Sequence, residues 1–235
     1  LSHHIKNILQ GLRSGSEIMK MGLDQKNDRL IQQGWRVAEK NQGKIYDLVM
    51  DMLNYSKDRI PNVEPTDLNE MVDDVVELLA PRAAELGVKL EKSTAPNLPR
   101  VPVDAEGVHR ALLNLVGNAI DAVEGRDDPK VDVSTRTADD GYVRIVVLDN
   151  GVGIAPERIP EMFKVFVSTK GSRGTGLGLP VSQKILREHG GDLLVQSQVN
   201  IGSKFTMKIP LKSPLIPDLS STSQNLPVLP PEGYD

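Results

Sequence analysis

The first sixty residues carry an apolar repeat that restricts the start of this chain to long helices. No proline occurs before Pro61, so nothing in the sequence interrupts a helix there. In the first predicted helix, apolar residues recur at helical spacing, at Ile5, Ile8, Leu9, Leu12, Met19 and Leu23. After a polar turn at 24–28, a second helix repeats apolar residues every seven positions, at Ile31, Ala38, Ile45 and Met52. Two helices cannot bury such stripes alone. We therefore predict that residues 1–60 form an antiparallel hairpin and that a homodimer completes a four-helix bundle.

A proline-containing stretch at 61–66 ends this pattern and predicts a linker. Beyond it, helical periodicity is predicted over 67–86, 104–123 and 179–189. Strand patterns are predicted over 88–92, 131–133, 143–147, 193–197 and 204–209. Helices over one face of a mixed sheet make a two-layer α/β sandwich, which we place at 67–211 in a chain of the α+β class. Residues 212–235 are rich in proline and serine and predict a disordered tail or linker.

Composition excludes several classes of function. The 235 residues contain no cysteine, which rules out disulfides, thiolate metal sites and cysteine nucleophiles. A net charge of −4 gives no basic excess that would attract nucleic acid. No apolar run is long enough to span a membrane, and neither a signal peptide nor an initiator methionine is present. We expect a cytoplasmic piece of a longer protein that is itself soluble or membrane-anchored.

The segment Asp149-Asn150-Gly151-Val152-Gly153 follows a predicted strand. A carboxylate fixed at a strand end can accept a hydrogen bond from an exocyclic amine, which adenine presents and guanine does not present at the same ring position. The glycines allow the backbone to turn sharply beside a base. Taken alone, the segment also fits an ordinary strand-ending turn.

The segment Gly174-Thr175-Gly176-Leu177-Gly178-Leu179 leads directly into a predicted helix. Backbone amides at a helix N-terminus, with glycines that permit close contact, suit phosphate groups. A Walker A loop would need a Lys-Ser/Thr pair after the last glycine, and this chain has none. A dinucleotide fingerprint would need a different glycine spacing after a strand, and residues 168–173 do not predict one.

Asn114 and Asn118 lie one turn apart on an otherwise apolar helix. Buried amides need hydrogen-bonding or metal partners. Phosphate-bound Mg²⁺ is one candidate partner, because it prefers oxygen ligands. A hydrogen bond inside the core is the other.

Together these three segments resemble the N, G1 and G2 boxes of the Bergerat ATP-binding fold, with 163–170 resembling its F box and 155–173 its ATP lid. The resemblance implies that Asn118 coordinates Mg²⁺, that Asp149 reads adenine, and that Lys170 and the 174–178 amides hold the phosphates. The other residues of the implied ATP site are Asn114, Asp121, Gly151, Gly153, Phe166, Thr169, Gly174, Thr175, Gly176, Leu177, Gly178 and Leu179. Hydrolysing members of this fold carry a glutamate four residues before the metal asparagine. Asn114 stands there in this chain, which places it with the phosphotransfer branch.

Residues 1–9, Leu-Ser-His-His-Ile-Lys-Asn-Ile-Leu, resemble the H box of sensor histidine kinases. The alignment makes His3 the phosphoacceptor, because choosing His4 would shift the following residues out of register. The resemblance implies ATP-dependent autophosphorylation of His3 in a homodimer, followed by phosphoryl transfer to an aspartate of a response regulator.

The H box departs from the family pattern at two positions. His4 replaces the usual acidic residue, so a carboxylate general base is missing, and Ile8 replaces the usual proline. Asn7 matches the position that orients water for dephosphorylation of the regulator. An alternative hypothesis is therefore a kinase-impaired regulator, biased toward phosphatase activity or docking, that still binds ATP. A plain ATPase is a third reading, and Asn114 and the histidine-bearing hairpin argue against it.

Overall fold

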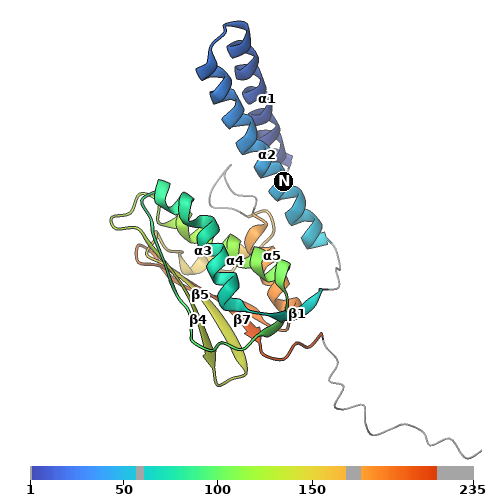
Figure 1. The fold of residues 1–235 in the computed structure, drawn as a ribbon, viewed down its shortest axis with the longest axis vertical. Coiled ribbons are helices and arrows are strands. Elements are labelled where there is room, and N and C mark those ends of the chain that lie inside the picture. Colours follow the sequence, from blue (N-terminus) through green and yellow to red (C-terminus); the bar gives the residue numbers. More distant parts are fainter. Residues whose placement is uncertain (1, 57–60, 168–175, 216–235) are drawn as a thin grey trace, which may run out of the picture.

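The computed structural model describes residues 2–56, 61–167 and 176–215, without the side chains of residues 2–4, 47, 51 and 54–56. Helices α1 (Ser2–Asp24) and α2 (Asp28–Ser56) form an antiparallel hairpin that projects from the rest of the molecule (Figure 1). Asn27 begins α2, because its Oδ1 accepts hydrogen bonds from the backbone amides of Arg29 and Leu30 at 3.1 and 3.3 Å. The predicted hairpin is therefore present, with its turn inside the predicted segment.

The two helices of the hairpin approach each other through glycine. A Cβ atom on Gly34 would lie 2.5 Å from the backbone nitrogen of Met19, and one on Gly15 would lie 2.7 Å from that of Ala38. Both glycines are buried. Backbone therefore meets backbone at this crossing, and no larger residue fits there without separating the helices.

Much of the apolar surface of the hairpin is left uncovered. Ile8 and Leu48 are almost fully buried, at 2% and 1% exposure. The exposed large apolar side chains of the hairpin are Leu9, Met21, Leu23, Trp35, Tyr46, Val49, Met52 and Leu53. Five of them lie on α2, at Trp35, Tyr46, Val49, Met52 and Leu53, and their spacing places them within about a third of the helix circumference. We call these five residues the open face of the hairpin.

A five-stranded mixed sheet forms one layer of the remaining molecule, in the order β2-β4-β5-β7-β6. Its strands are β2 (Lys89–Ser93), β4 (Lys130–Ala138), β5 (Tyr142–Asp149), β6 (Asp192–Gln198) and β7 (Gly202–Pro210). The β2–β4 pair is parallel and the other neighbouring pairs are antiparallel. Alternate residues of the central strand β5, such as Val143, Ile145 and Val147, are fully buried, as expected for a sheet covered on one face.

Helices cover that face of the sheet (Figure 1). They are α3 (Leu68–Glu85), α4 (Ala105–Ala122) and α5 (Gly178–Glu188). Helix α4 is central, and its buried residues are Val108, Ala111, Leu112, Leu115, Val116, Ala119 and Ile120. The asparagines of the predicted site are thus on the central helix of this layer. The predicted α+β chain, with a helical hairpin and a two-layer sandwich, is confirmed.

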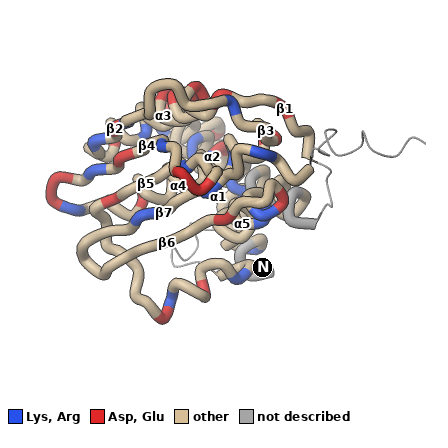
Figure 2. Tube along the Cα trace, turned by 90° about the horizontal axis from the view of Figure 1, so that it is seen from below, with Lys and Arg blue, Asp and Glu red and all other residues tan. Residues whose placement is uncertain are grey.

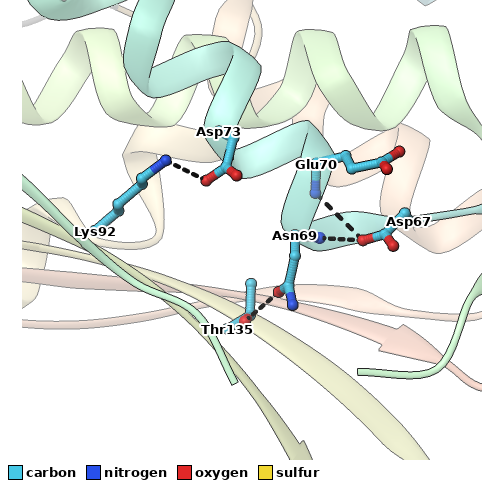
Figure 3. Close-up of polar contacts among 6 residues, drawn as sticks. All are labelled: Asp67, Asn69, Glu70, Asp73, Lys92 and Thr135. Carbon is cyan, nitrogen blue, oxygen red and sulfur yellow. Dashed lines mark hydrogen bonds and ion pairs between the residues drawn. The ribbon is translucent and has the colours of Figure 1, made fainter. Parts of the chain in front are cut away.

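A polar cluster fixes the start of α3 against the sheet (Figure 3). Asp67 caps the helix, because its Oδ1 accepts from the amides of Asn69 and Glu70. The Asn69 side chain then accepts a 2.7 Å hydrogen bond from the hydroxyl of Thr135 on β4, and donates to the carbonyl of Ala95 at 2.9 Å. The Asn69 and Thr135 side chains thus join helix, loop and strand.

The C-terminus of α5 is joined to the start of α4 by a buried histidine. His189 is 2% exposed, and its Nε2 accepts from the backbone amide of Asp104 at 2.9 Å. Its Nδ1 lies 2.7 Å from the carbonyl of Ile185 and is therefore the protonated nitrogen of a neutral ring. Asp104 also caps α4 through a bond from the amide of Gly107 at 3.3 Å.

Two boundaries differ from the prediction. The predicted linker 61–66 contains strand β1 (Val63–Thr66), which pairs antiparallel with β3 (Val101–Asp104) in a separate two-stranded sheet. The predicted tail 212–235 begins with a packed turn, because Ser213 is buried and its hydroxyl accepts from the amide of Leu215. Residues 216–235 lie outside the described residues. Strand β1 depends on its long-range pairing with β3, which a short segment with little periodicity of its own does not signal.

Acidic and basic residues are interspersed along the elements (Figure 2), in keeping with the small net charge. Within the described part of the chain, no helix combines the length and the apolar character needed to cross a membrane.

Candidate functional site

Asp149 lies at the end of β5 and is only 4% exposed. Its Oδ1 accepts hydrogen bonds from the backbone amides of Gly151 at 2.8 Å and Ser203 at 3.2 Å. Burial raises the pKa of the Asp149 carboxyl, against the opposing effect of these two amides. The group is thus held in one orientation, and its second oxygen, Oδ2, can accept from an amine donor. The contribution of Ser203 has no signal in the sequence, because it comes from backbone pairing between β5 and β7.

The turn after Asp149 depends on its glycines and on Asn150. Gly153 has a φ of +67°, and a Cβ there would collide with the carbonyl of Gln198. The Asn150 side chain donates to the carbonyl of Asp128 at 2.8 Å and accepts from the amide of Lys130 at 2.8 Å. Asn150 therefore supports the turn, a role that its place in an Asp-Asn-Gly segment suggests. Gly151 is buried beside the C-terminus of α4, as a close backbone approach requires.

Asn114 and Asn118 on α4 face the first turn of α5. Asn118 Nδ2 donates to Asn114 Oδ1 at 3.3 Å, and Asn114 Nδ2 donates to the hydroxyl of Ser182 at 3.1 Å. Ser182 in turn donates to the carbonyl of Gly178 at 2.9 Å. A Cβ on Gly178 would collide with the Asn114 amide, so glycine permits this contact. Ser182 was not among the sequence-predicted site residues.

A backbone hydrogen bond joins Phe166, inside the predicted ATP lid, to Gly176, just beyond the lid and before α5. The amide of Phe166 donates to the carbonyl of Gly176 at 2.9 Å, and both residues adopt a φ of +66°. Leu177 is buried at 1% exposure and Leu179 packs against the core. Two short 3₁₀ turns, η1 (Pro156–Arg158) and η2 (Glu161–Phe163), precede Phe166. The predicted residues Thr169, Lys170, Gly174 and Thr175 lie outside the described residues.

Asp121, another predicted site residue, forms an ion pair with Arg82 of α3. About half of the Arg82 side chain and a quarter of that of Asp121 remain exposed, at 49% and 27%. The pair joins α3 to the C-terminal half of α4.

The H-box residues occupy the start of α1. The backbone of His3 and His4 is helical, and their side chains are outside the described set. Asn7 follows His3 by one helical turn and is half-buried. Ile8, which replaces the proline of the family pattern, is buried at 2% exposure, and α1 continues through it without a break.

Comparison with known proteins agrees with this arrangement. Residues 103–213 match the family described as histidine kinase-, DNA gyrase B-, and HSP90-like ATPases. The catalytic domain of histidine kinase ThkA superposes with a TM-score of 0.58 and 30% identity, over 64% of this chain and 96% of that domain. A full-length ShkA structure in complex with AMPPNP gives a TM-score of 0.68 at 26% identity, over 80% of this chain and 40% of ShkA.

Two curated relatives extend the match along the chain. The signal transduction histidine-protein kinase AtoS of Escherichia coli is 29% identical over 90% of this chain and 34% of its own length. The sensor histidine kinase ZraS of Klebsiella oxytoca is 33% identical over 70% of this chain and 35% of its own length. The sandwich thus has the fold of histidine kinase catalytic domains. The chain belongs to the histidine kinase family, and it spans about a third of the length of these relatives.

Proposed function

We propose that this chain binds ATP between α4, the end of β5 and the start of α5, and transfers the γ-phosphoryl group to His3. The observation that carries this proposal is the chemistry at position 114. Hydrolysing members of the fold carry a glutamate there, by the resemblance above, and Asn114 instead has both amide atoms bonded to Ser182 and Asn118. An amide cannot act as a general base, so water is not activated at this position.

The proposed step forms a nitrogen–phosphorus bond. A neutral imidazole nitrogen of His3 attacks the γ-phosphorus in line, and the bond to the β,γ-bridging oxygen breaks as ADP leaves with the electron pair. The proton on the other ring nitrogen is released. An unperturbed histidine has a pKa of about 6.5, so an imidazole without perturbing neighbours is mostly neutral at pH 7 and can act as a nucleophile.

In this proposal the Asp149 carboxylate accepts a hydrogen bond from the exocyclic amine of adenine. Asn118 supplies the amide oxygen that suits Mg²⁺, a cation that prefers oxygen ligands and keeps several waters. When bound, Mg²⁺ would neutralise charge on the phosphate oxygens. Lys170 and the amides of 174–178 are proposed to hold the phosphates.

We further propose a homodimer and a response-regulator partner. The open face of the hairpin supports the dimer, since a second copy could cover its five exposed apolar side chains. The structure of histidine kinase ThkA in complex with the response regulator protein TrrA resembles this chain, with a TM-score of 0.65 at 23% identity over 88% of this chain and 61% of ThkA. By that precedent the phosphoryl group of His3 would pass to a regulator aspartate, on the cytoplasmic side where ATP is available.

The test is incubation with γ-labelled ATP and Mg²⁺ of the wild type, His3→Ala and His4→Ala. Acid-labile, alkali-stable label that is lost only in His3→Ala is the expected result. Label that persists in His3→Ala and disappears in His4→Ala would move the acceptor to His4. ATP binding measured in parallel, with no label on the wild type, would contradict the kinase proposal.

One observation favours a second candidate, a kinase-impaired regulator with phosphatase activity. His4 stands where the family carries an acidic residue, and general-base help contributes roughly 10²–10⁴-fold to a rate. Asn7 keeps its position on α1, one turn after His3. His4→Glu should therefore accelerate labelling if the missing carboxylate limits the rate. An unchanged rate would show that His4 already supplies this help.

A further inference from the structure

Ser182 links the two asparagines of α4 to the first residue of α5. It is 1% exposed on α5, one turn after Gly178, and its hydroxyl both donates to the Gly178 carbonyl and accepts from Asn114. The amide oxygen of Asn114 in turn accepts a hydrogen bond from the amide nitrogen of Asn118. Three hydrogen bonds therefore run in one direction, from Asn118 through Asn114 and Ser182 to the backbone of Gly178.

The direction of these three hydrogen bonds follows from the single proton of the Ser182 hydroxyl group. Because the Ser182 proton is committed to the Gly178 carbonyl, its oxygen can only accept from Asn114. Asn114 must then present its N–H₂ group to Ser182 and its carbonyl oxygen to Asn118. Asn118 in turn must present its N–H₂ group to Asn114.

The consequence is an oriented metal ligand. The nitrogen and oxygen of an amide diverge from the same carbon, so an Asn118 whose nitrogen is directed to Asn114 directs its oxygen elsewhere. Only that oxygen can bind Mg²⁺, since an amide nitrogen has no lone pair to offer. If the Asn114 amide flipped, two N–H₂ groups would face each other, unless Asn118 also flipped and turned its oxygen away from the metal.

We propose that Ser182 is a positioning residue for the metal ligand. It holds Asn118 in its metal-binding orientation and couples that orientation to Gly178, where the phosphate-binding segment meets α5. This inference rests on the proposed function, specifically on a metal role for Asn118. The competing view is that Ser182 is an ordinary buried serine bonded to the preceding turn of its own helix.

A matched pair of variants separates the hydroxyl from the volume it fills. Ser182→Thr keeps the hydroxyl. Ser182→Val has nearly the shape of the threonine variant but lacks the hydroxyl. Calorimetric titration with ATP, in Mg²⁺ and again in EDTA, measures the gain in affinity that Mg²⁺ provides. Loss of an outer-sphere partner typically weakens metal binding about 10–100-fold, so Ser182→Val should lose at least about tenfold of this gain. Ser182→Thr should keep it within about twofold, and affinity in EDTA should be unchanged in both.

Combining Ser182→Val with Asn118→Ala tests the route of the effect. If Ser182 acts through Asn118, the double variant should show the same Mg²⁺ dependence as Asn118→Ala alone. Equal losses in Mg²⁺ and EDTA, or equal losses in Thr and Val, would overturn the positioning role while leaving the proposed function intact. A wild type without any Mg²⁺-dependent gain would overturn both. If Ser182→Val fails to fold, Ser182→Ala gives the same comparison without added volume.

Discussion

The sandwich and the hairpin bury their apolar side chains to different degrees. In the sandwich, side chains from α4 and β5 such as Leu112, Leu115 and Ile145 are fully buried. In the hairpin, Trp35 is 59% exposed and Tyr46 64% exposed. The sandwich therefore has a complete core within one chain. The hairpin leaves several large apolar side chains exposed, and the backbones of its two helices approach each other closely at Gly15 and Gly34.

The largest expected effect tests the closed core. Leu112→Ala should destabilise the sandwich by about 2–5 kcal/mol, because it removes a fully buried side chain from the central helix. Hydrogen exchange of β4 and β5 peptides in urea measures this loss. Fluorescence of Trp35, the single tryptophan, follows the hairpin in the same samples and should not change. Leu78→Ala is the control, since Leu78 is 60% exposed on α3. A parallel shift of the Trp35 transition would show instead that the two regions unfold together.

The next effect concerns Asp149, whose buried carboxylate lies at the proposed adenine position. Asp149→Asn should weaken ATP binding by about 1.5–3 kcal/mol, because a charged acceptor is lost. The raised pKa means that the folded state favours the protonated carboxyl, so the ionised form lowers stability at neutral pH. The nucleotide-free variant should therefore unfold at higher urea than wild type at pH 7. This difference should disappear as pH falls below the ordinary pKa of aspartate. Lower stability at pH 7 would contradict the assigned cause.

In the hairpin, the corresponding test is at the glycine crossing. Gly34→Ala should destabilise the hairpin by about 1–3 kcal/mol, because a Cβ would lie 2.5 Å from the Met19 nitrogen. Gly43→Ala is the matched control on the same helix, with nothing within 4 Å of its added Cβ. It should stabilise α2 by roughly 0.5–1 kcal/mol. Trp35 fluorescence in urea measures both, and similar changes would show that the helices do not meet at Gly34.

The smallest effect tests what covers the open face. For a homodimer, a tenfold increase in concentration should stabilise the hairpin by about 1.4 kcal/mol, seen as a shift of its Trp35 transition. Val49→Lys places a charge on this face, where Val49 is 48% exposed, and should remove the concentration dependence. Sedimentation should then give the mass of one chain. A dimer that survives Val49→Lys would place the interface elsewhere.

Most of the fold could be predicted because it is periodic. The helices expected at 67–86 and 104–123 correspond to α3 and α4 within one residue at each end. Strands β1 and β3 were missed, since each has four residues and each contains a proline, Pro65 or Pro102. Val101 and Val103 are both fully buried and show the alternation of a strand, which is the signal that could have revealed β3.

The candidate site could be predicted only where a single segment carries it. Asp149 and Asn118 belong to recognisable local patterns. Ser182 and Ser203 do not, because each contributes through an element that is distant in sequence, Ser182 to Asn114 and Ser203 to Asp149. The glycine crossing was missed for the same reason, since only the pairing of α1 with α2 gives Gly15 and Gly34 their role.

The ring of His189, which joins α5 to α4, gives nuclear magnetic resonance signals that report the contact between these two helices. Both nitrogens of His189 are engaged by backbone groups, one from Asp104 at the start of α4 and one from Ile185 within α5. The ring is therefore confined to a single tautomer, and the nitrogen chemical shifts of the two positions should be widely separated. Release of α5 from α4 would let the ring average between tautomers and bring those shifts together. One ring spectrum would thus report, without any label on the nucleotide, whether the two helices that carry the site remain docked.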